Sequence, residues 1–300
     1  MSKKQRDDLD KMLRGGPLNL AGDVKEQRKI FDKMMTEHPL PKDVITKPGT
    51  LNGVKVLNID IVGAKSDDVI LYLHGGAYAI GTAATTADLA SNIVRLSGVR
   101  AVSVDYRLAP EFPYPAAVED AVAAYKGLLD NGTPASNIAM VGESAGGGLV
   151  LATLLSLKSA GLPQPSSAVL MSPWADLTLS GESMKTKAAV DPALTPAGLR
   201  LRASDYVADN DASDPLISPV FADLTGLPRL LIQVGSREIL LDDAMRIATQ
   251  AENADVAVTL EVTPDVPHVF PSFAAILDEG DSALKSSARF LRSNLDPKPV

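Results

Sequence analysis

The chain contains no cysteine, which excludes disulfide bonds, a cysteine nucleophile and thiolate metal sites. It has no apolar run approaching the roughly 20 residues needed to cross a bilayer. Its charged beginning, Met-Ser-Lys-Lys-Gln-Arg-Asp-Asp, lacks the apolar region of a signal peptide. Positive charge is scarce too, because 29 Lys and Arg stand against 37 Asp and Glu, for a net charge of −8. We therefore expect a soluble cytoplasmic protein with no nucleic-acid groove and no membrane partner.

Histidine is also scarce, and its three residues are the candidates for a catalytic histidine base. They are His38, His74 and His268. Apolar residues are plentiful by contrast: they make up 45% of the 300 residues, enough for a full core in one large domain or two modest ones.

Beyond Gly53 the chain alternates between short apolar runs and segments with helical spacing. Strands are predicted at 54–61, 69–73, 101–104, 138–141, 168–171, 230–234 and 256–262, and helices at 87–96, 116–129, 145–159, 243–253 and 282–294. Continuous apolar strands are typical of parallel sheets covered on both faces. The alternation predicts an α/β fold with a mostly parallel sheet between two layers of helices.

Two segments do not follow this alternation. Residues 1–50 are polar and predicted to be helical, with Asp23 capping a helix that ends before Pro39. Residues 179–214 carry no strand signal, and Thr195-Pro196 is a good helix start. We expect both segments to form a helical cap over the carboxyl ends of the strands. Residues 51–178 and 215–300 would then form the core.

A Gly-Glu-Ser-Ala-Gly sequence at 142–146 lies between the strand 138–141 and the helix that starts at 145. This context places Ser144 on a sharp strand-to-helix turn, where its hydroxyl can act as a nucleophile. Gly142 and Gly146 avoid collisions with the neighbouring strand and helix. The Ala145 N–H lies at the positive end of the helix dipole. A plain Ser/Gly turn is the alternative, and the strand and helix on either side disfavour it.

A second glycine-rich sequence, His-Gly-Gly-Ala-Tyr at 74–78, follows the strand 69–73. Its backbone can approach a substrate carbonyl and donate N–H groups to a developing oxyanion. We assign Gly75, Gly76 and Ala145 as the oxyanion donors. His74 is expected to fix the loop rather than to act as the base. A plain glycine turn is the alternative here.

The base and the acid of a serine hydrolase follow the nucleophile in chain order. His268 is the only histidine after Ser144, and it follows the strand 256–262 in a loop. Glu238 follows the strand 230–234 and is the favoured acid, with Asp242 as the alternative; Asp242 and Asp243 are otherwise interpreted as helix caps. Together these features predict a serine hydrolase of the α/β-hydrolase type.

These sequences resemble the hormone-sensitive-lipase-like family of bacterial esterases. The resemblance rests on Leu-His-Gly-Gly at 73–76, Asp-Tyr-Arg-Leu-Ala-Pro-Glu at 105–111, Gly-Glu-Ser-Ala-Gly-Gly at 142–147, Ser-Pro-Trp-Ala-Asp-Leu at 172–177 and Asp-Pro-Leu-Ile-Ser-Pro at 214–219. It extends from about residue 50 to the end of the chain. The chain departs from the family at Ala77, where a third glycine is frequent, and at Glu238, where aspartate is frequent.

The resemblance implies hydrolysis of short- to medium-chain acyl esters, a cap beside the acyl-binding cleft, and dimers through an edge strand in many members. The expected partner is a small-molecule acyl ester, which is hydrolysed through an acyl-enzyme intermediate. The reaction is expected to need no metal and no organic cofactor. Tyr78 and Trp174 are candidate pocket residues, although a core role suits Trp174 equally well. An amidase or deacetylase with the same triad is an alternative. A non-catalytic receptor on this fold is another, disfavoured by His268.

Overall fold

The computed structural model describes residues 3–37, 39–64 and 66–295, so His38 lies outside the described residues. Its centre is an eight-stranded sheet in the order β1-β2-β4-β3-β5-β6-β7-β8. The strands are β1 (Val44–Leu51), β2 (Val54–Ile61), β3 (Val69–Leu73), β4 (Arg100–Val104), β5 (Ile138–Glu143), β6 (Ser167–Met171), β7 (Arg229–Gly235) and β8 (Val258–Thr263). Pairings from β4 to β8 are parallel, whereas β1–β2 and β2–β4 are antiparallel. The prediction of a mostly parallel sheet is confirmed.

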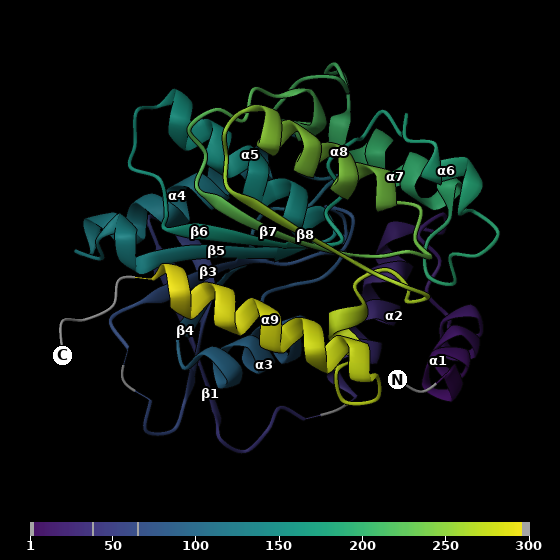
Figure 1. The fold of residues 1–300 in the computed structure, drawn as a ribbon, viewed down its shortest axis with the longest axis horizontal. Helices are drawn as coiled ribbons and strands as arrows, with labels where there is room; N and C mark the ends of the chain where they lie inside the picture. Colours follow the sequence, from purple (N-terminus) through teal and green to yellow (C-terminus); the bar gives the residue numbers. More distant parts are fainter. Residues whose placement is uncertain (1–2, 38, 65, 296–300) are drawn as a thin grey trace.

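Helices cover both faces of the sheet (Figure 1). One layer consists of α3 (Ala87–Ser97) and α9 (Asp278–Asn294), and the other of α4 (Ala116–Asp130), α5 (Ala145–Ser159) and α8 (Leu241–Asn253). Every residue of β3 and β5 is buried between the layers, which explains their unbroken apolar sequence. Within the described residues, no helix is both long and apolar enough to cross a membrane.

Four further helices gather at one end of the sheet in Figure 1: α1 (Lys3–Arg14), α2 (Val24–Thr36), α6 (Ser183–Thr186) and α7 (Pro196–Val207). Short 3-10 helices occupy Ala135–Asn137, Pro219–Phe221 and Phe270–Phe273. Asp23 accepts the N–H groups of Lys25 and Glu26, and Thr195 accepts that of Gly198. Both predicted helix starts are therefore present, with side-chain caps.

The prediction that residues 1–50 are helical is wrong for Val44–Leu51, which form the edge strand β1. This strand joins β2 through Asn52 and Gly53, both with positive φ (45° and 86°), as a tight hairpin turn of this kind requires. Most of its side chains are exposed, so it carries no apolar alternation, and pairing with β2 holds it in the sheet. The N-terminal part of the proposed cap therefore ends before Val44.

Replacing Thr195 by alanine should destabilise the start of α7, because the Gly198 N–H loses its acceptor. We expect a loss of about 1 kcal/mol in the free energy of unfolding, measured by urea denaturation. Thr249→Ala is the matched control, since Thr249 lies exposed within α8 and caps no helix end. Equal stability of the Thr195 variant and the wild type would contradict the capping role.

Candidate active site

Ser144 lies on the turn between β5 and α5 with φ 56° and ψ −125°, a conformation that non-glycine residues rarely adopt. Two hydrogen bonds hold it there. Its N–H donates to the Met171 carbonyl at 2.9 Å, and its carbonyl accepts the Trp174 N–H at 2.9 Å. The end of β6 and the residues after it therefore fix the turn from one side.

Gly142 and Gly146 lie where the turn passes closest to the rest of the chain. A Cβ on Gly146 would lie 2.0 Å from the Leu73 carbonyl oxygen, and one on Gly142 would lie 2.3 Å from the Gly146 carbonyl oxygen. These obstacles are backbone atoms, so a side chain cannot be accommodated by rotating a neighbour. The close approach brings the start of α5 against the end of β3, where the loop of residues 74–80 begins.

The structure brings Ser144, His268 and Glu238 together into one chain of hydrogen bonds. His268 Nε2 lies 2.9 Å from Ser144 Oγ, and His268 Nδ1 lies 2.6 Å from Glu238 Oε2. Since Nδ1 faces a carboxylate, it carries the proton, and Nε2 is left to accept one from the serine. Glu238 is fully buried, and His268 has an exposed fraction of 9%.

The second oxygen of Glu238 is anchored independently of the histidine. Oε1 accepts the Gly235 N–H at 2.7 Å and the Ser172 hydroxyl at 2.8 Å. The same hydroxyl oxygen accepts the Val269 N–H at 3.0 Å, so Ser172 bridges the acid and the residue after His268. Sequence reasoning missed this residue, because its partners lie 66 and 97 positions away.

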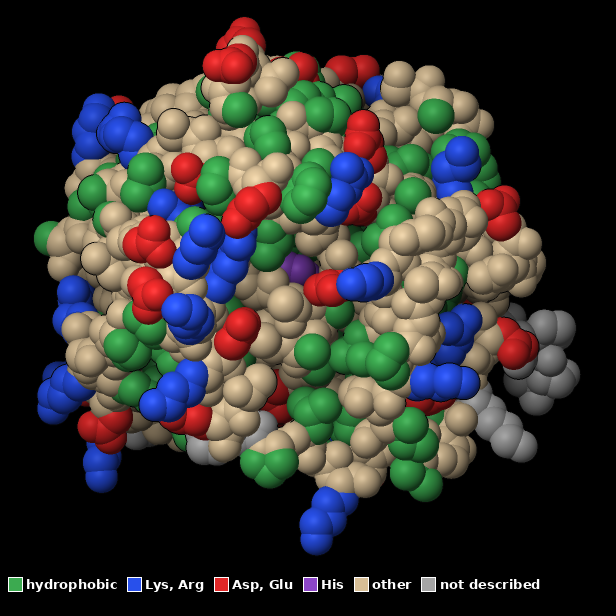
Figure 2. All heavy atoms as spheres, turned by 180° about the vertical axis from the view of Figure 1, so that it is seen from behind, with side chains coloured by type: hydrophobic (Ala, Val, Ile, Leu, Met, Phe, Trp, Pro, Cys, Tyr) green, Lys and Arg blue, Asp and Glu red, His purple; other side chains and the backbone are tan. Residues whose placement is uncertain are grey.

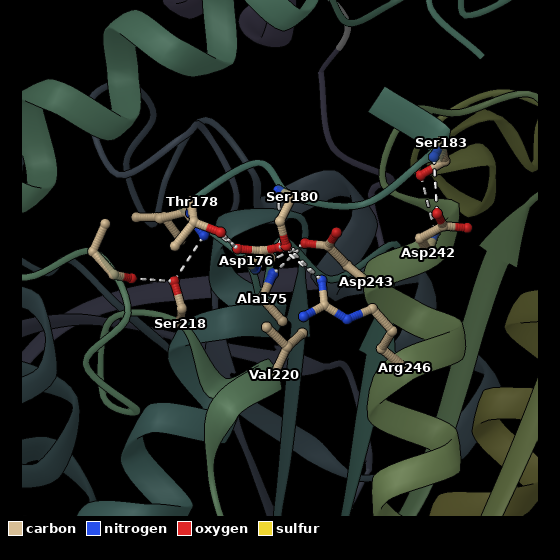
Figure 3. A network of polar contacts seen from close by, with 12 residues as sticks. Ala175, Asp176, Thr178, Ser180, Ser183, Ser218, Val220, Asp242, Asp243 and Arg246 are labelled. Carbon is tan, nitrogen blue, oxygen red and sulfur yellow. Dashed lines mark hydrogen bonds and ion pairs between the residues drawn. The ribbon is translucent and has the colours of Figure 1, made fainter. Parts of the chain in front are cut away.

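Asp242, the alternative acid, faces elsewhere: its carboxylate accepts the Ser183 N–H at 2.8 Å (Figure 3). The interpretation of Asp242 and Asp243 as helix caps is also wrong, since α8 follows Leu240 without a side-chain cap. Asp243 instead accepts the N–H groups of Ala175 and Asp176, at 2.9 and 2.8 Å. Both carboxylates therefore fix the segment that follows β6 rather than their own helix.

Asp176 lies at the centre of the network in Figure 3 and is fully buried. Arg246 reaches it from α8 at 2.7 Å, and the hydroxyls of Thr178 and Ser180 donate to it. Although burial opposes ionisation, the hydrogen bonds from Ser180, Thr178 and Arg246 lower the pKa of Asp176. Burial raises the pKa of Asp243 well above its usual range. The network thus holds one ion pair in the segment that also fixes Ser144 through Trp174.

The loop of residues 74–80 has most of its carbonyl groups fixed by the protein. His74 Nδ1 lies 2.7 Å from the Gly75 carbonyl oxygen, and the Gly76 carbonyl accepts the N–H groups of Ala79 and Ile80, both at 2.9 Å. In a trans peptide the N–H points opposite to the C=O. The N–H groups of Gly76 and Ala77 therefore point away from these partners, and neither has an acceptor in the described part of the chain.

The N–H group of Gly75, unlike those of Gly76 and Ala77, has an acceptor. It donates to Glu143 Oε1 at 2.7 Å, so it is not available to a substrate oxygen. The predicted oxyanion role of Gly75 therefore does not fit its contacts, whereas the Gly76 N–H and the neighbouring Ala77 N–H have no acceptor within the described residues. The Ala145 N–H belongs to the first turn of α5, where N–H groups have no acceptor within the helix.

His74 is fully buried, and its ring stacks on Tyr106 with 4.2 Å between centroids. Burial lowers its pKa to about 4, so the ring is neutral at physiological pH. Because Nδ1 faces a carbonyl oxygen, that atom carries the proton. The Tyr106 hydroxyl donates to the His74 carbonyl at 2.6 Å. These contacts fit the expectation that His74 fixes the loop and does not act as the base.

Tyr78 and Trp174, the candidate pocket residues, have exposed fractions of 2% and 0%. Tyr78 stacks on Tyr206 of α7 with 3.9 Å between ring centroids, and Trp174 Nε1 donates to the Asp176 carbonyl. The structure therefore favours the core role for Trp174. Rings buried this deeply present almost no surface to a ligand, and a pocket role for either stays a prediction.

Figure 2 shows histidine atoms at the floor of a hollow rimmed by charged side chains. Among the described histidines, His268 is the one with an exposed fraction above zero. A separate cavity of about 360 Å³ lies beneath α2, and its lining includes Arg28 and Glu111 but none of the predicted site residues. Arg28 binds both oxygens of Glu111 and donates to the Ala79 carbonyl at 2.8 Å, which ties α2 to the loop of residues 74–80.

Comparison with known proteins identifies the relatives of this chain. A sequence profile of a family described as alpha/beta hydrolase fold matches residues 70–272. The chain belongs to this family. An acetyl-hydrolase of Streptomyces hygroscopicus is 46% identical over 75% of this chain and 75% of its own length. An esterase of Acinetobacter venetianus is 36% identical over 92% of this chain and 90% of its own length.

Similar solved structures show to which group within the α/β-hydrolase family the chain belongs. A bacterial esterase of the hormone-sensitive lipase family superposes with a TM-score of 0.94 and 42% identity, covering 99% of this chain and all (100%) of that chain. EstE5 superposes with a TM-score of 0.94 and 40% identity, covering 98% of this chain and 99% of that chain. The resemblance seen in the sequence is confirmed, and the chain is a carboxylic ester hydrolase of this α/β-hydrolase group.

Burial makes the stability of the protein depend on pH through Glu143, whose pKa it raises to about 7. The folded protein keeps a proton that the unfolded chain releases near pH 4.5. This contribution to stability is therefore full below pH 4.5 and is lost as pH rises through 7. Relative to wild type, Glu143→Gln should gain up to about 3 kcal/mol between pH 4.5 and pH 8. Urea denaturation of both proteins across this range measures the difference, and a difference independent of pH would contradict the assignment.

Proposed function

We propose that this esterase is a serine carboxylesterase that hydrolyses short- to medium-chain acyl esters through Ser144, His268 and Glu238. The observation that carries the proposal is the continuous hydrogen-bond chain from Ser144 Oγ through both ring nitrogens of His268 to Glu238 Oε2. The hollow above His268 gives a substrate access to this chain. A relative named acetyl-hydrolase supports a small acyl group.

In the first half of the reaction, Ser144 Oγ attacks the ester carbonyl while His268 Nε2 takes its proton. The carbonyl oxygen becomes an oxyanion, which the free N–H groups of Gly76, Ala77 and Ala145 stabilise. Each such donor is worth about 3 kcal/mol of the barrier. His268 then gives its proton to the departing alcohol, and the acyl group remains on Ser144.

In the second half, a water takes the place of the alcohol and attacks the acyl carbon while His268 removes its proton. The bond between the acyl carbon and Ser144 Oγ then breaks, His268 returns the proton to Oγ, and the carboxylic acid leaves. Glu238 holds the ring in the tautomer with Nδ1 protonated and stabilises the imidazolium that forms in both halves. Ser172 and the Gly235 N–H keep the carboxylate in the plane the ring requires by occupying its other oxygen. Every step uses groups of this chain, the ester and water.

An acyl-chain-length series of p-nitrophenyl esters tests the reaction and the pocket size together. We expect the highest kcat/KM with short to medium acyl chains, and a loss of at least about 10³-fold in kcat for Ser144→Ala. A serine-reactive phosphonate should label the wild type and not the variant. Turnover that survives Ser144→Ala unchanged would contradict the proposal. Faster cleavage of matched anilides than of esters would assign the amidase function instead.

The identity of the acid is tested by comparing Glu238→Gln with Asp242→Asn. Glu238→Gln should lower kcat by about 10³-fold or more, because an amide NH2 group opposite Nδ1 favours the wrong tautomer. Asp242→Asn is the matched control and should change kcat less than about threefold, since Asp242 binds Ser183 and not His268. The reverse order of effects, measured with one p-nitrophenyl ester, would assign the acid to Asp242.

Dimerisation through an edge strand and a cytoplasmic location stay predictions from the sequence and the family. In the described sheet, β1 and β8 are the edge strands. Size-exclusion chromatography with light scattering measures the oligomeric state directly.

A further inference from the structure

We propose that Glu143, the residue before the nucleophile, is a positioning residue whose carboxyl holds the Gly75 N–H and thereby aims the free N–H groups of the next two residues at the substrate. The proposal rests on the esterase function proposed above, and it assigns to Glu143 a part in that reaction beyond the triad. Its basis is a set of contacts to both backbone groups of Gly75.

Glu143 is buried, with an exposed fraction of 6%, and each of its carboxyl oxygens has one partner. Oε1 accepts the Gly75 N–H at 2.7 Å, and Oε2 accepts the Tyr72 hydroxyl at 2.5 Å. The carboxyl therefore joins the residue preceding Ser144 to the loop that starts after β3. The two segments are 68 positions apart in the chain.

Gly75 is held at both of its backbone groups. Glu143 fixes its N–H, and His74 Nδ1 fixes its carbonyl. With both peptide planes of Gly75 set, the N–H of Gly76 has one direction, opposite to the Gly75 carbonyl. Without the carboxyl, the plane before Gly75 is held at one end alone, by the Tyr106 hydroxyl on the His74 carbonyl, and it loses the partner that fixes its N–H.

Gly75 also lies in close contact with Glu143 and Ser144. A Cβ on Gly75 would lie 3.0 Å from the Glu143 carbonyl oxygen, 3.2 Å from Ser144 Cβ and 3.3 Å from Glu143 Cγ. Gly75 therefore packs directly against the nucleophile turn. A shift of the loop of a few tenths of an ångström changes the distance between the oxyanion donors and the carbon that Ser144 attacks, and such misplacement lowers kcat.

Two substitutions separate the hydrogen bond from the charge. Glu143→Ala removes the acceptor and should lower kcat for a p-nitrophenyl ester by about 10- to 100-fold with KM within about threefold, because oxyanion donors act in the transition state. Glu143→Gln keeps an oxygen for the Gly75 N–H and should retain kcat within about fivefold of wild type. Asp120→Asn is the matched control, since the buried Asp120 carboxyl also accepts a backbone N–H, that of Arg107, away from the proposed site.

Amide hydrogen exchange at Gly75 reports the contact without any turnover. Exchange should be slow in the wild type and in Glu143→Gln, and at least about tenfold faster in Glu143→Ala. The proposal is overturned by wild-type kcat in Glu143→Ala, by unchanged exchange at Gly75, or by a Gln variant as impaired as the Ala variant. If the wild type hydrolyses no ester, the proposed function fails, and an exchange rate at Gly75 that does not respond to Glu143→Ala still overturns the contact.

Discussion

The close approach between the start of α5 and the end of β3 is the constraint on which the rest of the site depends. Gly146 lies against the Leu73 and His74 carbonyls, with no room for even one added carbon. The contact lies beside the strained backbone of Ser144 and at the start of the loop of residues 74–80. The turn that carries Ser144 and the loop of residues 74–80 are therefore two parts of one packing arrangement, so a shift of one is felt by the other.

Because peptide units are planar, this packing also sets the direction in which the free N–H groups of the loop point. His74 fixes the Gly75 carbonyl, and Ala79 and Ile80 fix the Gly76 carbonyl. The N–H groups on the opposite side of these two planes, those of Gly76 and Ala77, have no acceptor among the described residues. Unpaired N–H groups next to a buried site cost free energy in the resting protein. An oxyanion that forms beside them receives donors already in position, which is the reason such a site accelerates the reaction rather than only binding the substrate.

Much of this arrangement could be predicted from the sequence, because its signals are local or depend on chain order. Ser144 lies on the predicted turn, and His268 followed from its place after Ser144. That the Gly75 N–H is already bound could not be predicted, since its partner Glu143 lies 68 positions away in the chain. Strand β1 was missed because its exposed side chains give no periodicity. Asp243 was misjudged because its partners are N–H groups of a distant loop.

His268 lies near more than one buried carboxyl group. Besides Glu238, the buried carboxyls of Glu143 and Asp191 lie near enough for a charged His268 to lower the pKa of each, although burial raises both overall. Both carboxyls therefore belong to the surroundings of the imidazolium that forms in the proposed reaction.

Asp191 also accepts the Ile239 N–H at 2.9 Å, next to Glu238, so the segment between α6 and α7 holds the acid in place. A cap segment that moved away would remove this support from the residue next to Glu238, the carboxylate that holds the His268 ring in the proposed reaction.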